Sequence, residues 1–138
     1  IYFANGVAVD AKEECVYVAE TMQRRVLRFE IRDGNTAGPK EIYGPETLGR
    51  LGFPDGIAFD EAGNLWVTFP VANALGFIDP QGRLRIVVED PDGAVIRRPA
   101  NICFGGKDRR TAFIGSLAGN NIPCFDVPYP GMRLVHQK

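Results

Sequence analysis

The sequence predicts an all-β protein that is built from a repeated unit. The stretch "FPDGIAFDEAGNLWVTFP" at 53–70 resembles the earlier "FANGVAVDAKEECVYVAET" at 3–21, and "RPANICFGGKDRRTAFIGSL" at 98–117 is a weaker third copy. No stretch shows a sustained 3.6-residue apolar period, and sixteen glycines and ten prolines are present, so we expect very little helix. Four short antiparallel strands in every 40 to 50 residues or so are typical of a β-propeller blade.

The first copy, about 3–50, is expected to contain four strands. They are predicted at 4–10, 14–20, 24–31 and about 40–44. The segments between them, such as "DAKEE" and "RDGNTAGP", are rich in residues that tolerate turn geometry. The first strand contains the apolar run "GVAV", which suits an innermost strand that is buried on both faces between neighbouring blades.

The second copy, about 53–95, and the third, about 98–138, follow the same plan. The second is expected to form strands at 55–60, 64–69, 74–79 and 84–89. The third is expected to form strands at 100–104, 111–116, 121–126 and 132–136. An aromatic residue, Tyr17, Trp66 or Phe113, recurs at one aligned position, and we expect these three to pack in the core.

The 138 residues are therefore interpreted as a single, partial propeller domain. Propellers typically have about four to eight blades, so three blades cannot close a ring and would expose two apolar blade faces. Either the natural protein is longer or two copies associate as a homodimer to complete a six-bladed ring. The chain opens on Ile1 without methionine, which suggests a fragment, a processed chain or an incomplete record. A twelve-stranded β-sandwich is the structural alternative.

Composition argues against several classes of partner. The net charge is −1 with acids and bases interspersed, so we expect no nucleic-acid binding. No apolar run approaches the roughly 20 residues of a membrane span, and no secretory signal is visible, so a cytoplasmic location without membrane contact is expected. His136 is the only histidine, which argues against histidine zinc sites and a Ser–His triad. Three cysteines (Cys15, Cys103 and Cys124) are expected to be small buried thiols in a reducing compartment.

Two oxygen-bearing side chains mark the starts of the innermost strands. Asn5 and Asp55 align between the first two copies, whereas the third copy has Ala100 at this position and Asn101 one residue later. Innermost strands run along the propeller channel, so these residues would face one mouth of it. An amide oxygen and a carboxylate suit a hard divalent cation such as calcium or magnesium. A simple Asn-Gly or Asp-Gly turn is the alternative explanation.

Other residues are expected to lie near this mouth. Gly6 and Gly56 follow the two oxygen-bearing residues, and we expect that a side chain there would crowd the backbone near the axis. Glu20 and Ser116 end second strands, where each is either a substrate contact or a solvated strand end. Arg97 and Arg98 precede the third innermost strand and could attract an anionic sugar-acid product.

The chain resembles a known family. The phrases "FANGVAVD", "FPDGIAFDEAGNLWV", "GFIDPQGRL" and "PANICFGGKDRRTAFIGS" are similar to the senescence marker protein/gluconolactonase/luciferin-regenerating-enzyme family over roughly residues 3–127. The first copy also resembles strictosidine-synthase-like propellers. The resemblance implies the C-terminal half of a six-bladed propeller and a divalent metal, calcium, in the channel. Asn5 matches the family's metal-binding asparagine, and Asp55 matches its metal-binding and catalytic aspartate. The family's glutamate ligand lies in the N-terminal half.

The function predicted on this basis is metal-dependent hydrolysis of a small lactone or ester. Water would attack a metal-polarised carbonyl, with Asp55 as metal ligand and base. Asn5 would be a second ligand, and Glu20 and Asn101 would contact the substrate. A non-catalytic propeller fragment that binds small molecules or proteins and a strictosidine-synthase-like enzyme are the alternatives, because the fold alone does not decide function.

Overall fold

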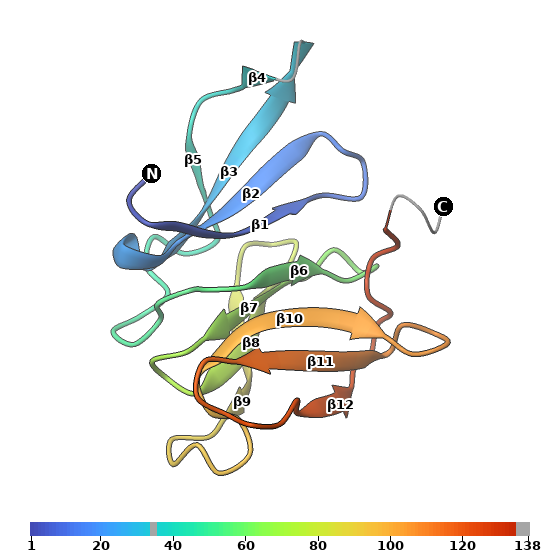
Figure 1. Ribbon diagram of the computed structural model, residues 1–138. Coiled ribbons are helices and arrows are strands. Elements are labelled where there is room, and N and C mark those ends of the chain that lie inside the picture. Colours follow the sequence, from blue (N-terminus) through green and yellow to red (C-terminus); the bar gives the residue numbers. More distant parts are fainter. Residues whose placement is uncertain (34–35, 135–138) are drawn as a thin grey trace.

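The computed structural model describes residues 1–33 and 36–134, which form three antiparallel sheets that follow one another along the chain (Figure 1). The first sheet contains β1 (Ala4–Val9), β2 (Cys15–Glu20), β3 (Arg25–Arg32), β4 (Thr36–Ala37) and β5 (Glu41–Tyr43). The second contains β6 (Ile57–Phe59), β7 (Leu65–Phe69), β8 (Ala74–Ile78) and β9 (Leu84–Glu89). The third contains β10 (Pro99–Gly105), β11 (Thr111–Ser116) and β12 (Cys124–Asp126).

The prediction of an all-β chain is confirmed. Helix is limited, within the described residues, to one 3-10 turn, η1 (Thr21–Gln23). Every strand expected in the first two copies is present, with ends that differ by one or two residues at most. Three separate sheets rather than two are formed, so the β-sandwich alternative is wrong. In the described part of the chain, no helix has the length and apolar character needed to cross a membrane.

The expectation of three four-stranded units is correct only for the second sheet. The first sheet gains the short strand β4, which pairs with the end of β3, and the third has three strands. Of the strand expected at 132–136, residues 132–134 are not in a strand, and the rest lies outside the described residues. The chain turns instead to the second sheet. There Gly131 pairs with Asp60 in an isolated β-bridge, and the Met132 N–H donates to Phe59 O at 3.0 Å. Glycine fits there because a Cβ would lie 2.1 Å from Phe104 Cβ.

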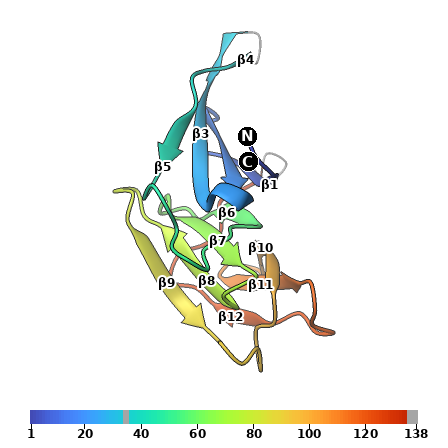
Figure 2. The same ribbon diagram turned by 90° about the vertical axis from the view of Figure 1, so that its left-hand side faces the viewer.

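The first strands of the three sheets lie next to one another. β1, β6 and β10 each form one edge of their sheet, and β6 lies between the other two (Figures 1 and 2). β6 has the burial expected of an innermost strand, because Ile57 and Phe59 are buried. β1 does not, since its other side is uncovered and Val7 is 59% exposed. The expectation of burial on both faces is therefore wrong for β1.

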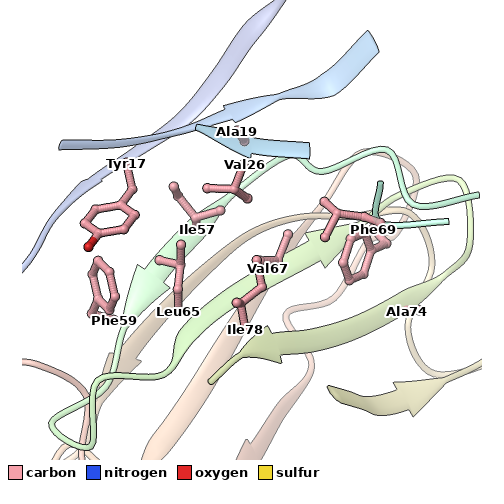
Figure 3. Close-up of a cluster of buried hydrophobic side chains, with 11 residues drawn as sticks. Tyr17, Ala19, Val26, Ile57, Phe59, Leu65, Val67, Phe69, Ala74 and Ile78 are labelled. Atoms are coloured by element: carbon pink, nitrogen blue, oxygen red, sulfur yellow. The ribbon is translucent and has the colours of Figure 1, made fainter. Parts of the chain in front are cut away.

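The hydrophobic core consists of two clusters, one at each boundary between sheets. Figure 3 shows the first, in which side chains of the first sheet face those of the second. Tyr17 belongs to it, with its ring edge-on to Phe59 and to Tyr43 at 4.9 Å between centroids. The second cluster packs Trp66 and Leu75 against Ile102 and other apolar residues of the third sheet. The repeat explains this, because Tyr17 and Trp66 each face the sheet that follows their own.

β7 separates the two clusters by simple alternation. Leu65, Val67 and Phe69 face the first cluster, and Trp66 faces the second, as expected when successive strand residues point to opposite faces. Core packing is thus confirmed for Tyr17 and Trp66, while Phe113 is only half-buried.

The expectation of three buried thiols is wrong. Cys15 is half-buried, and Cys103 and Cys124 are exposed, and all three thiols are free. Exposure of Cys103 has the same cause as that of Val7, because both lie on edge strands that are open on one side.

Candidate functional site

At their starts, β1 and β10 approach β6 so closely that the glycines at these contacts have no room for a side chain. A Cβ on Gly6 would lie 2.4 Å from Asp55 O, and a Cβ on Gly56 would lie 2.7 Å from Ala100 O and 2.6 Å from Asn101 Cα. The Gly6 N–H donates to Asp55 O at 2.9 Å. The expectation that a side chain at Gly6 or Gly56 would crowd the neighbouring backbone is therefore confirmed. Asn5, Asp55 and Ala100, which precede or face these contacts, therefore occupy equivalent places in the three sheets.

The structure brings Asn5 and Asp55 together. Their side chains lie close enough to interact, with Asn5 exposed and Asp55 half-buried. Burial raises the pKa of Asp55 above its usual range, and the interaction with the Asn5 amide offsets only part of that effect. A simple turn does not explain the pairing, because the two residues come from different sheets. Their roles as ligands and in catalysis stay predictions.

Asn101 lies beside the same point. Its Cα is one of the atoms that a Cβ on Gly56 would meet, so it neighbours the segment that carries Asp55. The exposed side chain has its Oδ1 accepting the Ile102 N–H at 2.9 Å. Because that oxygen accepts a hydrogen bond from the chain itself, the Nδ2 group carries the remaining donor capacity of this side chain. The contact of Asn101 with a substrate stays a prediction.

Thr68 fixes the backbone of Asp55, and sequence reasoning missed it. The side chain is fully buried in β7, where its Oγ1 accepts the Gly56 N–H at 2.9 Å. The Thr68 carbonyl accepts the Asp55 N–H at 3.0 Å. Both bonds hold Asp55 at the start of β6. The signal available in the sequence was one hydroxyl inside the otherwise apolar stretch "LWVTF".

Thr21 connects the two segments that carry the candidate ligands. Its Oγ1 donates to Pro54 O at 2.7 Å, immediately before Asp55. Its N–H donates to Phe3 O at 3.1 Å, two residues before Asn5. Thr21 therefore links the segment that leads into β1 to the segment that leads into β6. No sequence motif pointed to it, because both partners are backbone carbonyls.

Glu20 is buried, with only 2% of the residue exposed. Its two carboxylate oxygens accept hydrogen bonds from the Tyr2 N–H at 2.7 Å and Arg25 Nε at 2.6 Å. Burial alone would raise the pKa of Glu20, but these hydrogen bonds and the charges of Arg25 and Lys40 lower it. The alternative of a solvated strand end is wrong for Glu20. The arrangement favours a role in holding the chain before Asn5 over the predicted substrate contact.

Ser116 organises the loop that follows β11. Its Oγ donates to Arg97 O and accepts the N–H groups of Ala118 at 3.1 Å and Gly119 at 2.6 Å. The hydroxyl is thus shared among three backbone groups. This arrangement favours a structural role for Ser116 over the alternative of a substrate contact.

The donor set at Asn5 and Asp55 suits a hard cation but cannot complete its shell. Calcium takes about 6–8 oxygen ligands, and these two side chains supply an amide and a carboxylate oxygen. Among residues 1–33 and 36–134, no group of three or more His, Cys, Asp or Glu side chains comes together. A cation here would therefore need water or ligands from another part of the assembly.

The fold and the site define a class of protein in which antiparallel sheets repeat along the chain. Carboxylate and amide oxygens lie where the first strands of neighbouring sheets begin. The chain belongs to the family described as SMP-30/Gluconolactonase/LRE-like region, whose model matches residues 1–118. It is 27% identical over 120 residues to 6-deoxy-6-sulfogluconolactonase from Pseudomonas putida, a match that covers 87% of this chain and 40% of that protein. It is 29% identical over 119 residues to regucalcin from Danio rerio, covering 84% of this chain and 38% of that protein.

A solved structure supports the same fold. A luciferin-regenerating enzyme superposes with a TM-score of 0.76 at 20% identity, covering 97% of this chain and 49% of that one. This chain spans about two fifths of the length of the curated relatives it matches. The likeness extends through all three sheets, so the sheets have counterparts within a protein about twice as long.

Proposed function

We propose that this protein hydrolyses a small lactone or a related ester at the point where Asn5 and Asp55 meet. The observation that carries the proposal is that these two side chains, at the starts of the first strands of two sheets, lie close enough to interact in a chain of the gluconolactonase-like family. Lactonases among the relatives support the reaction class.

The three sheets are proposed to be blades that form half of a six-bladed propeller. The coverage of 49% of the luciferin-regenerating enzyme supports a half-ring. So do large exposed apolar side chains near both ends of the row of sheets, such as Tyr2 and Val7 at one end and Leu117 and Ile122 at the other. Further blades, from a longer chain or from a second copy in a homodimer, would cover these faces. They would also supply the missing ligands.

Asn5 and Asp55 are proposed to hold a divalent cation, calcium, as the resemblance to calcium-binding relatives suggests. When bound, the cation would polarise the lactone carbonyl and stabilise the negative charge that develops on its oxygen. The half-buried position of Asp55 supports this role, because a carboxylate that has lost water gains from a nearby positive charge.

In the proposed reaction, Asp55 orients a water molecule and accepts its proton as the water oxygen bonds to the carbonyl carbon. The ring C–O bond then breaks, and the proton passes to the leaving ring oxygen, which gives the hydroxy acid. Asn101 is proposed to contact the substrate through Nδ2. Thr68 and Thr21 hold the segments that lead into β1 and β6 in place.

The test is the thermal stability of the wild type, Asp55→Asn and the control Asp126→Asn, each measured with and without calcium at pH 7. Asp126 is exposed on β12. Calcium at about 100 times its dissociation constant would stabilise the wild type by about 2.7 kcal/mol. Asp55→Asn is expected to lose this shift and the lactonase activity, and the control is expected to keep both.

Without calcium, Asp55→Asn is expected to melt above the wild type. A carboxyl whose folded-state pKa is raised stabilises the fold only in its protonated form, and this contribution is lost as the pH rises through that pKa. At pH 7 the wild type therefore carries a charge that burial disfavours, and the neutral amide removes it. A full calcium shift in Asp55→Asn would refute the ligand assignment.

A further inference from the structure

Two arginines at the entry to β10 are left unexplained by the proposed reaction. Arg97 and Arg98 are exposed and line a depression of about 370 Å³, together with residues that include Val71, Asn73 and Ala118. Among the described residues, no carboxylate lies within ion-pair distance of either guanidinium. This contrasts with Arg25 and other arginines of the chain, whose charges are matched by Glu or Asp.

The backbone that carries these arginines is held from two sheets. The Arg98 N–H donates to Asn73 Oδ1 at 2.8 Å, from the turn after β7. The Arg98 carbonyl accepts the Leu117 N–H at 3.0 Å, and the Arg97 carbonyl accepts the Ser116 hydroxyl, both from the end of β11. The polar groups of the second and third sheets thus fix the main chain, so the guanidinium groups are not needed to stabilise the loop.

The local conformation places both side chains at one depression. Neighbouring residues of an extended strand point to opposite sides. Arg98 instead has a left-handed φ of 44°, and its partner Asn73 has a φ of 48°. A left-handed conformation is unfavourable for a residue with a Cβ, and such strain persists where surrounding contacts impose it. Here its consequence is that both arginines line one hollow.

The depression lies at the same end of the strands as Asp55. Arg98 precedes Asn101 by three residues, and Asn101 Cα lies against Gly56. Three residues of extended chain span at most about 10 Å, so the backbone of Arg98 lies within about 10 Å of that of Asn101. The long arginine side chain can reach across part of this distance. The opposite wall belongs to the turn after β7, the strand in which Thr68 binds Gly56. Both walls are therefore continuous with the strands that fix Asp55.

We propose that Arg97 and Arg98 form an anion-binding subsite for a phosphate-like tetrahedral oxyanion carried by a sugar lactone, at the end remote from its reacting carbonyl. This rests on the proposed function and deepens it by naming the substrate class. Guanidinium groups bind such oxyanions through paired, charge-assisted hydrogen bonds. Asp92 lines an adjoining depression of about 480 Å³ that shares Arg97, and its negative charge makes that second depression the less favourable place for an anion.

The first arm of the test compares kcat/KM for glucono-1,5-lactone and its 6-phosphate in the calcium-loaded protein. Arg97→Gln and Arg98→Gln are each expected to lose about tenfold or more on the phosphorylated lactone and to stay within about twofold on the neutral one. The control, Arg85→Gln, removes an exposed arginine whose Nε is 3.9 Å from Asp79 and is expected to change neither. Equal losses on both substrates would overturn the subsite.

The second arm measures binding without chemistry, by the melting shift that D-glucose 6-phosphate and D-glucose produce. The phosphate ester is expected to stabilise the wild type and Arg85→Gln more than glucose does, and Arg97→Gln and Arg98→Gln are expected to lose the difference. A wild type that hydrolyses neither lactone would refute the proposed function, while this arm would still decide the subsite. No extra shift from the phosphate, or a shift retained in both variants, would overturn it.

Discussion

Replacing Gly56 with alanine is expected to destabilise the protein and displace Asp55 from its neighbours. The new Cβ would lie 2.6 Å from Asn101 Cα and 2.7 Å from Ala100 O. Carbon atoms in contact are about 3.5–4.0 Å apart, so β6 and β10 have to separate by about 1 Å. Both nearest atoms belong to backbone, so a change of rotamer cannot relieve the contact.

The cost can be estimated from these distances. Overpacking of this kind costs about 1–3 kcal/mol, and about 0.4–1 kcal/mol is regained because alanine restricts the unfolded chain. The free energy of unfolding of Gly56→Ala is therefore expected to fall by about 1–2 kcal/mol. With urea m-values of about 1–3 kcal/mol/M, the midpoint moves down by roughly 0.5–1 M. Fluorescence of Trp66, the only tryptophan, reports the transition.

Gly115→Ala is the matched control. Gly115 pairs with Asn101 in the neighbouring strand β11, and a Cβ there would meet its nearest atom, Asn101 Cβ, at the ordinary distance of 3.4 Å. This variant is expected to be as stable as the wild type or slightly more stable. If Gly56→Ala unfolded at the same urea concentration as Gly115→Ala, the close approach of β6 and β10 would be refuted.

Two further predictions concern buried carboxylates. Asp60→Asn removes the acceptor that Asp60 Oδ2 provides for the Trp66 indole at 3.0 Å and the Asn64 amide at 2.8 Å, so it is expected to cost at least about 2 kcal/mol in urea unfolding. The aligned Asp10→Asn keeps an oxygen for its two backbone donors and is expected to cost less than about 1 kcal/mol. Equal losses of stability in the two variants would contradict the role of Asp60 Oδ2 as an acceptor for the Trp66 and Asn64 side chains. Glu20→Gln is expected to be less stable than the wild type at pH 7, with a gap that narrows by pH 3. The reason is that the lowered pKa of Glu20 stabilises the fold above an unfolded-state value of about 4.3, and this is lost as the pH falls through the folded-state pKa. A gap unchanged between these pH values would count against the role of the ion pair.

The repeat made much of the site predictable. Aligning the first two copies placed Asn5 and Asp55 at equivalent strand starts, and the geometry of adjacent first strands then brought them together. The same alignment explained why Gly6 and Gly56 lack side chains, because both face a neighbouring backbone. Local periodicity and turn residues were enough for the strands of the first two copies.

Contacts between distant segments were beyond the reach of the sequence. Thr21 and Thr68 bind backbone atoms, which leave no complementary residue to recognise. The chain after β12 pairs with the second sheet because Gly131 fits against Phe104, and this contact has no counterpart in the first two copies. Exposure of Val7 and Cys103 depends on which neighbours cover the edge strands, and a single chain does not encode that locally.

The position of the two apolar clusters has a consequence for how the molecule comes apart. Among the sheets that the described residues form, the second alone packs on both sides, because one cluster joins it to the first sheet and the other joins it to the third. In a linear array of this kind, stability is nearly a sum of unit terms and nearest-neighbour interface terms. The end units each lose one interface when they open, whereas the middle unit has to break two. In these three sheets taken alone, unfolding is therefore expected to begin at the outer two, and the stretch around Trp66 is expected to unfold last.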